Sequence, residues 1–311
     1  MLLPPAFDYV ETFDKAFGDR GFWDPYFDQV IRRHDLPDPT GEVTVGVGGT
    51  YPTLVYGGLV IKLFGFAKAW KTSIVAERAA HELLADDPDI AAPQLVSMGV
   101  LFPDEASSWP YLVTTRVPGT PWELTSMTTK ERLQVATELG LQLRRIHALR
   151  PHGHESTLTA PGPGISEAAA QSCLSPHLVE QVDDFMRTLD TYGRVFVHGD
   201  LVQLHAFVDN GRLAGIIDWG DAVVTDPHYE LGKLAFELFD CDKQLLSVFL
   251  DASQWVRGPE FARQALGLAL QRQAVGLTQH HTFDVFEPVG DHYPLCDIAT
   301  LDELAAELFN V

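Results

Sequence analysis

The 311-residue sequence predicts an α+β protein of two lobes, a small lobe built on an antiparallel sheet and a larger, mainly helical lobe. Residues 42–64 are rich in β-branched and aromatic residues and are interrupted by glycine pairs, as in hairpins. After Pro118 the apolar residues recur mainly at helical spacing. A sheet-rich part followed by a helix-rich part indicates two lobes with a cleft between them, and we place the boundary between residues 1–117 and 118–311.

The remaining elements follow from the spacing of apolar residues. Residues 8–35 are rich in aromatic side chains and predict one or two amphipathic helices. The segment 73–85 has helical spacing, and 109–117 is an apolar strand that ends at a Pro-Gly turn. In the second lobe we expect a helix over 130–149, whose apolar side chains share one face, and another over 176–191.

The composition limits the partners of the protein. It has 43 acidic and 22 basic side chains, and a formal net charge of −21 repels nucleic acids and anionic membranes while it attracts cations. An acidic surface that only aids solubility explains the same charge. No apolar run is long enough for a membrane helix, and the first residues lack the regions of a secretory signal. Three widely spaced cysteines fit a reducing, cytoplasmic compartment and argue against a disulfide framework or a zinc site.

Two short apolar strands, 194–200 and 212–221, each lead to an aspartate, Asp200 in the first and Asp218 in the second. Phosphoryl transfer requires such a pair, because one carboxylate orients the attacking hydroxyl and another holds the metal ion that bridges the phosphates. Either aspartate alone is better explained as a turn former or loop cap. The two together, close in sequence and in this order, favour a catalytic function.

These segments resemble a known signature. HGDLVQLH (198–205), followed by IIDWGD (216–221), is similar to the H-G-D-x-x-x-x-N and D-W/F motifs of the aminoglycoside phosphotransferase family. The resemblance implies a protein-kinase-like fold and transfer of the γ-phosphate of ATP or GTP to a hydroxyl group, with Mg²⁺ as cofactor. It also implies that Asp200 is the catalytic residue and that Asp218 is a metal ligand.

Other parts of the chain resemble the family in the expected order. Lys62, in the segment VIK, resembles the lysine that holds the α- and β-phosphates, and Glu77 resembles the glutamate that pairs with it. Residues 111–119 are similar to the hinge between the lobes, where Thr115 and Val117 would contact adenine through their backbone. The glycine-rich stretch 46–50 either cradles phosphates or forms a hairpin turn.

The main departure from the family is His205, which stands where most members have an asparagine on the metal. Imidazole can also ligate a divalent ion, although Mg²⁺ prefers oxygen, and the related macrolide kinases look similar at this place. We therefore favour His205 as a second metal ligand beside Asp218. The alternative is a packing residue in a protein that has lost one metal site or its activity.

Several fragments, among them FWDPYFDQVIRRHDLP and TFDVFE, resemble hygromycin B phosphotransferases of the actinomycete type. This implies an aminoglycoside-type antibiotic as acceptor, with antibiotic resistance as the outcome. Because such acceptors are polycations, the net charge of −21 would attract them to the protein. Acidic residues of the second lobe are the candidate contacts for their ammonium groups: Asp221, Asp240, Asp242, Asp284 and Glu287.

Three other functions stay open at this point. A kinase of a macrolide or another metabolite would have the same nucleotide site. A non-catalytic nucleotide-binding protein would explain His205 as a lesion. A metal-dependent hydrolase built from the histidine and aspartate residues is the most distant, because the pair His280-His281 lacks partners at a ligating spacing and is interpreted as surface or substrate-pocket residues.

Overall fold

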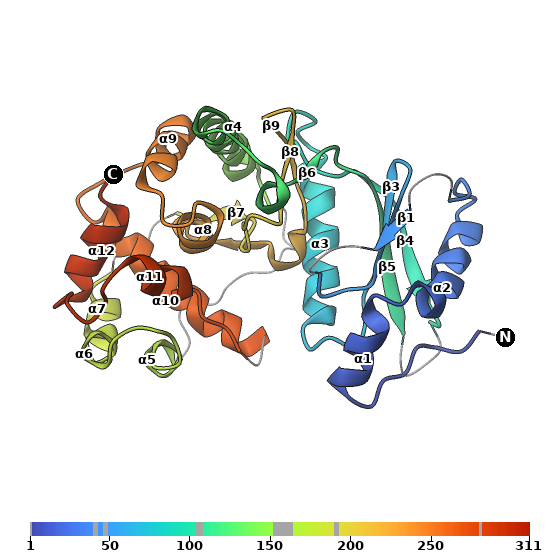
Figure 1. Ribbon diagram of the computed structural model, residues 1–311, viewed down its shortest axis with the longest axis horizontal. Helices are drawn as coiled ribbons and strands as arrows, with labels where there is room; N and C mark the ends of the chain where they lie inside the picture. Colours follow the sequence, from blue (N-terminus) through green and yellow to red (C-terminus); the bar gives the residue numbers. More distant parts are fainter. Residues whose placement is uncertain are drawn as a thin grey trace.

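The protein folds into two lobes, a smaller one that holds a sheet and the first three helices, and a larger one made mainly of helices (Figure 1). The α+β architecture predicted from the sequence is confirmed, whereas the lobe boundary between residues 117 and 118 stays a prediction. Residues 46–48 and the pair His280-His281 lie outside the described part of the chain. The computed structural model describes residues 2–39, 43–45, 49–103, 108–151, 164–189, 193–279 and 282–311.

The smaller lobe is built on a five-stranded antiparallel sheet with the strand order β1-β2-β3-β5-β4. The sequence pattern did not predict β4, an edge strand whose exposed side chains include Val96 and Met98, so that it lacks the polar–apolar alternation of a half-buried strand. The strands are β1 Val43–Val45, β2 Thr53–Tyr56, β3 Leu59–Leu63, β4 Leu95–Leu101 and β5 Trp109–Thr115.

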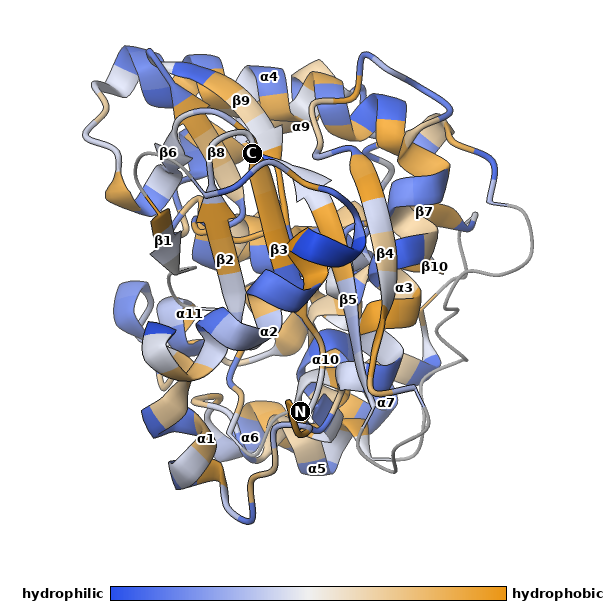
Figure 2. Ribbon diagram, turned by 90° about the vertical axis from the view of Figure 1, so that its right-hand side faces the viewer, coloured by the Kyte–Doolittle hydropathy of each residue, from blue (hydrophilic) through white to orange (hydrophobic). Residues whose placement is uncertain are grey.

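Helices cover both faces of this sheet. Figures 1 and 2 show α2 (Arg20–Arg33) on one face and α3 (Trp70–Leu84) on the other. The side chain of Asp19 accepts a hydrogen bond from Phe22 N–H and so begins α2, which separates it from α1 (Val10–Phe17). The predicted aromatic segment is therefore two helices, and its aromatic rings form the core between these helices and the sheet.

The position of β3 in the middle of the sheet determines where its side chains point. Because successive side chains of a strand face opposite sides, Ile61 and Leu63 enter the aromatic core beside α1 and α2. Lys62 lies between them in sequence and points to the other side of the sheet, where α3 lies. The alternation of side-chain direction along β3 thus places Lys62 on the side of the sheet that faces the space between the lobes.

The larger lobe is a helical body around one apolar core. Helix α4 begins at a capping box between Thr128 and Glu131 and confirms the helix expected over 130–149. Among the described residues, no helix combines the length and the apolar character that crossing a membrane requires. The helices are α4 Thr129–Ala148, α5 Ile165–Ala169, α6 Pro176–Val179, α7 Val182–Arg187, α8 Tyr229–Lys233, the π-helix η3 Leu234–Leu238, α9 Lys243–Ser253, α10 Phe261–Gln279, α11 Glu287–His292 and α12 Leu301–Phe309.

The single helix predicted over 176–191 is wrong, because α6 and α7 are separate and the second ends at Arg187. The chain turns at Gln181, whose side chain donates to Ala299 O at 3.0 Å and accepts from Leu301 N–H at 3.1 Å. Partners 118 and 120 residues away are invisible to the local spacing of apolar residues.

Short strands of the larger lobe carry the two aspartate motifs. β7 (Val195–Val197) pairs with β10 (Val223–Thr225), whereas β9 (Arg212–Ile216) pairs with β8 (Ala206–Asp209), which also pairs with β6 (Thr120–Pro121). The segments that lead to Asp200 and Asp218 therefore belong to different sheets. What brings them together lies in the loops that follow the strands.

Candidate active site

Lys62 is held between two carboxylates, one from each lobe. Its Nζ atom lies 2.7 Å from Glu77 Oε2 and 2.7 Å from Asp218 Oδ1, so the predicted contact with Glu77 is confirmed. The rings of Tyr51 and Phe64 lie 5.5 Å and 5.3 Å from the ammonium. Burial alone would lower the pKa of Lys62, but the two carboxylates outweigh it and raise the pKa, so that Lys62 is a cation at neutral pH.

Asp218 takes a strained place just beyond β9. Its φ angle of 64° is uncommon for a residue with a side chain, and such conformations cluster at functional sites. Burial alone would raise the pKa of Asp218, but Lys62 and His205 outweigh it and lower the pKa to about 2. The neighbouring Trp219 is fully buried and stacks on Phe196, so it belongs to the core of the larger lobe.

The two aspartate motifs meet through their backbones. Gly199 has a φ angle of 82°, and a Cβ atom built on it would lie 2.3 Å from the carbonyl oxygen of Asp221. Only a glycine fits this contact, because a side chain would collide with the backbone and would also disfavour the positive φ. His198 adds a second link, since its Nε2 lies 2.9 Å from Ile217 O.

His198 supports the loop that carries Asp200. Its Nδ1 atom accepts the Asp200 N–H at 3.2 Å, so Nε2 carries the proton and donates to Ile217 O. Burial lowers the pKa of His198 to about 4, so the ring is neutral at pH 7. The carboxylate of Glu230 accepts the N–H groups of His198 and Gly199 at 2.7 Å and 3.3 Å. Both ring nitrogens of His198 are thus used to hold backbone groups.

His205 faces Asp218 with the nitrogen that can ligate a metal. Its Nδ1 atom lies 2.7 Å from Asp200 O and so donates its proton to that carbonyl. The Nε2 atom lies 3.5 Å from Asp218 Oδ2, and in the neutral ring it has a free lone pair. A backbone carbonyl that orients the ring of a ligating histidine is a common arrangement in metal sites.

The donor set fits Mg²⁺ as a two-residue site completed by phosphate. Mg²⁺ is typically bound by one or two protein ligands together with substrate phosphates and water. Asp218 Oδ2 and His205 Nε2 would supply the protein ligands. Within the described parts of the chain there is no group of three or more His, Cys, Asp or Glu side chains that could hold a metal.

Asp200 is flanked by two cations that the sequence analysis did not find. Its Oδ1 atom lies 3.2 Å from Lys233 Nζ and 3.3 Å from Arg272 Nη2. Burial alone would raise the pKa of Asp200, but Lys233, His205 and Arg272 outweigh it and hold the pKa well below its usual range. Arg272 is the one charged residue in the sequence 264–279, and a lone charge in an apolar helix is a signal for a buried ion pair.

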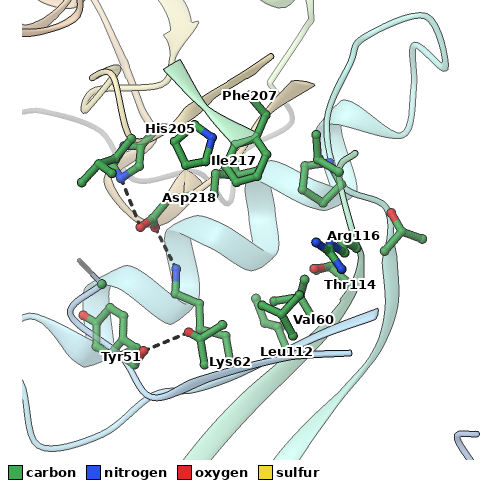
Figure 3. Close-up of a pocket in the computed structure, with 18 of the residues that line it drawn as sticks. Tyr51, Val60, Lys62, Leu112, Thr114, Arg116, His205, Phe207, Ile217 and Asp218 are labelled. Carbon is green, nitrogen blue, oxygen red and sulfur yellow. Dashed lines mark hydrogen bonds and ion pairs between the residues drawn. The ribbon is translucent and has the colours of Figure 1, made fainter. Parts of the chain in front are cut away.

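A cavity of about 290 Å³ opens between the lobes, with Lys62 and Asp218 in its wall (Figure 3). Apolar side chains line it from both sides, with Val60 and Leu112 from the sheet and Phe207 from the larger lobe. A cavity with apolar walls and a few converging charges is typical of a small-molecule site.

The predicted hinge borders this cavity, because both Thr115 and Val117 line it. The Thr115 N–H donates to Gln94 O at 2.9 Å and the Arg116 N–H to Gly58 O at 2.8 Å. Within the chain segments described, no hydrogen bond uses the Val117 N–H. A backbone donor at the cavity wall is therefore available to a ligand.

The five predicted acceptor contacts lie in different surroundings. Asp221 is next to the reacting groups, and its Oδ1 atom accepts a hydrogen bond from Gln279 Nε2 at 2.8 Å. Burial raises the pKa of Asp221, and Asp200 adds to the increase. This carboxylate belongs to the same cluster as Asp200 and Asp218.

The other four candidates have partners of their own. Asp240 Oδ1 lies 2.9 Å from His292 Nε2. Asp242 caps helix α9, and Asp284 accepts hydrogen bonds from two backbone N–H groups. Glu287 is exposed at the start of α11. None of the four is among the described residues that line the cavity with Lys62, so their contact with an acceptor stays a prediction.

A comparison with known families agrees with this geometry. The sequence pattern of the phosphotransferase enzyme family matches residues 53–265, which include Lys62, Asp200 and Asp218. The chain belongs to this family. It is therefore an enzyme that transfers phosphoryl groups to hydroxyl acceptors, and the resemblance seen in its sequence motifs is confirmed at the level of the family.

Solved structures share the fold at low identity. A macrolide 2'-phosphotransferase, MphH from Brachybacterium faecium, is 17% identical with a TM-score of 0.59, covering 93% of this chain and 99% of that one. The wild-type aminoglycoside 2'-phosphotransferase-IIIa, a GDP complex, is 17% identical with a TM-score of 0.63 (86% and 99%). A microcompartment-associated aminopropanol kinase is 14% identical with a TM-score of 0.64 (91% and 98%). These likenesses confirm the two-lobed kinase-like fold and leave the acceptor undecided.

The contact between the two motifs gives a prediction about stability. We expect Gly199→Ala to lower the free energy of unfolding by about 3 kcal/mol, because it combines a left-handed conformation with a collision against Asp221 O. The matched control is Gly57→Ala, since Gly57 has a φ angle of 50° but no atom within 4 Å of its added Cβ, and it should cost only about 1 kcal/mol. Urea unfolding measures both values, and equal losses would show that the contact with Asp221 is unimportant.

Proposed function

We propose that the protein transfers the γ-phosphate of a nucleoside triphosphate to a hydroxyl group of a small cationic antibiotic. The observation that carries the proposal is the contact of Lys62 with Asp218 in the wall of the cavity between the lobes. The cavity brings together a cation for phosphates and a carboxylate for a metal, and a second carboxylate for the acceptor is that of Asp200, the residue whose backbone carbonyl is bonded by His205 of the cavity wall. We also propose that the lobes divide between residues 117 and 118, and that the enzyme works in the cytoplasm.

The nucleotide would bind with its base against the apolar wall and its phosphates toward Lys62. Val60 and Leu112 on one side and Phe207 on the other would enclose the base. The free Val117 N–H and the backbone of Thr115 would form hydrogen bonds with the edge of the base. Lys62, held by Glu77, would bind the α- and β-phosphates.

The metal ligands in this proposal are Asp218 and His205. When bound, Mg²⁺ supplies positive charge that neutralises the phosphate oxygens. The protein contributes an ionised Asp218 and an imidazole whose tautomer is fixed by Asp200 O. Whether the enzyme uses ATP or GTP is left to direct assay of both.

The acceptor hydroxyl would donate its hydrogen bond to Asp200 and attack the γ-phosphorus. One P–O bond forms with the acceptor oxygen as the bond to the leaving diphosphate breaks, and the hydroxyl proton passes by way of Asp200 to solvent. Because its pKa is held low, Asp200 is a weak base that mainly aligns the hydroxyl. This suits a loose transition state, in which proton removal comes late.

A polycationic aminocyclitol of the hygromycin B kind is the acceptor that we propose. The sequence fragments shared with hygromycin phosphotransferases and the net charge of −21 support this choice. Asp221 is the candidate contact closest to the reacting groups, and Asp240, Asp242, Asp284 and Glu287 would act farther out. Transfer to such an antibiotic would confer resistance.

The first test concerns Asp200. Asp200→Asn should keep the fold and nucleotide binding, while turnover falls by about two to four powers of ten, as expected for a group that aligns the acceptor. The measurement is nucleotide consumption against a panel of aminoglycosides and macrolides. Turnover close to that of the parent would remove Asp200 from the mechanism.

The second test concerns the metal ligands. Asp218→Ala should abolish the Mg²⁺-dependent part of nucleotide binding, because the main anionic ligand is lost. His205→Asn should retain it, since an amide oxygen can ligate, while His205→Ala should weaken it by about tenfold. The nucleotide-induced shift in melting temperature, titrated with Mg²⁺, reports binding without turnover. If the alanine variant binds like the parent, His205 is not a ligand.

The third test concerns the charge of the acceptor. Contacts between carboxylates and ammonium groups in an open cleft are screened by salt, with a Debye length of about 10 Å at 0.1 M. The KM for the antibiotic should therefore rise with ionic strength, whereas kcat changes much less. Survival of a sensitive bacterium on hygromycin B and on erythromycin completes the test, and growth on erythromycin alone would assign a different acceptor.

A further inference from the structure

The two oxygens of the Asp200 carboxylate have different surroundings. Oδ1 is contacted by Lys233 Nζ at 3.2 Å and by Arg272 Nη2 at 3.3 Å. Oδ2 lies 3.7 Å from His205 Nδ1, whose proton is already donated to the Asp200 carbonyl at 2.7 Å. Within the described residues, Oδ2 therefore has no hydrogen-bond donor of its own. One oxygen is fixed by the protein and the other is left for a ligand.

Both cations are buried, and burial of a charged group is costly. The side chain of Lys233 is 9% exposed and that of Arg272 is 2% exposed. Replacement of buried ion pairs by apolar residues is often neutral or stabilising, so such pairs are weak evidence for a role in folding alone. Phe283 lies beneath both cations, 5.0 Å from Lys233 Nζ and 4.9 Å from the Arg272 guanidinium. The two cations and this ring form one rigid group beside Asp200.

The two cations reach Asp200 in different ways. Arg272 also donates to Gly199 O at 3.1 Å and to Gln279 Oε1 at 3.4 Å, so it shapes the backbone of the loop as well. Among the described residues, the ionic partners of Lys233 are the Asp200 carboxylate and Glu237, which lies one turn farther along the chain at 2.6 Å. The π-helix η3 begins directly after Lys233, and π-helical turns are frequent at functional sites.

We propose that Lys233 and Arg272 are positioning residues that hold Asp200 by Oδ1, so that Oδ2 is the oxygen that receives the acceptor hydroxyl. The proposal rests on the proposed phosphotransfer to that hydroxyl. A carboxylate held at one oxygen cannot rotate about its Cβ–Cγ bond, so its free lone pairs point in one direction. Alignment of this kind is a large part of catalysis when the reaction needs little proton transfer.

The test is a double-mutant cycle on turnover, with Lys233 as the cleaner probe. Lys233→Met removes the ammonium and keeps an unbranched apolar stem, and kcat should fall about 10–100-fold, as for a misplaced catalytic group. The KM for the nucleotide should change less than about twofold, because the phosphate site is untouched. In the Asp200→Asn background the same substitution should cost less than about threefold, since Lys233 acts through Asp200. Lys233→Arg should recover most of the lost activity.

The control is Lys243→Met, which removes a lysine that pairs with Glu307 at 3.0 Å on the exposed side of α9. It changes the net charge by the same amount and should leave kcat unchanged. If Lys233→Met does not fold, Lys233→Gln, which keeps a hydrogen-bond donor, replaces it, and the same non-additivity with Asp200→Asn is expected.

Two outcomes would overturn the proposal. Parental kcat in Lys233→Met, while Asp200→Asn is inactive, would remove the positioning role and leave the proposed function intact. A loss that is equally large in both backgrounds, together with a lower nucleotide-induced melting shift, would assign Lys233 to the fold. Failure of the proposed function has a different signature, because the parent itself would then transfer no phosphoryl group to any acceptor.

Discussion

The ammonium group of Lys62 is the point on which the arrangement of the cleft depends. It belongs to the central strand of the smaller lobe, yet one of its two carboxylate partners, Asp218, is 156 residues farther along the chain, in the larger lobe. Three charges meet here, and removal of Lys62 would leave the carboxylates of Glu77 and Asp218 without the cation that they share. The helical turn after Asp218 packs on α3, which also carries Glu77. The contact between the lobes and the charges of the site are therefore built from the same residues.

The loop that carries Asp200 illustrates how a short motif is fixed without regular secondary structure. Backbone groups of the loop are bonded by the carboxylate of Glu230 and by Nδ1 of His198, whose Nε2 donates to Ile217 O of the other motif. Burial raises the pKa of Glu230 to about 7, so the carboxyl group titrates near neutrality. A carboxyl group whose pKa is higher in the folded protein than in the unfolded one stabilises the fold at any pH below its unfolded pKa. This contribution to the free energy of unfolding is lost as the pH rises through the folded pKa of about 7. The free energy of unfolding should accordingly decrease toward the alkaline side.

Much of the fold could be predicted from local patterns, because hairpins and amphipathic helices have their own periodicity. The helix α4 and, apart from β4, the sheet of the smaller lobe followed from these patterns, whereas the pairing of Lys62 with Glu77 followed from the resemblance to the family. The break between α6 and α7 did not, because it depends on contacts of Gln181 with residues more than a hundred positions away. The contacts of Lys233 and Arg272 with Asp200 were missed for a similar reason. These two residues belong to helices, and no sequence pattern predicts that the helices approach the loop of Asp200.

The burial of Arg272 has a consequence for any attempt to improve this protein. A guanidinium that is 2% exposed is costly to desolvate, yet replacing Arg272 alone would leave Asp200 short of a counter-charge and destabilise the fold. Joint replacement of a buried ion pair by apolar side chains of similar volume, in contrast, is often neutral or stabilising, by about 1–4 kcal/mol. Screening combinatorial variants for heat resistance alone would therefore enrich joint apolar replacements of the reacting carboxylate and its cations. Libraries for directed evolution should keep these codons fixed, or select for turnover in every round.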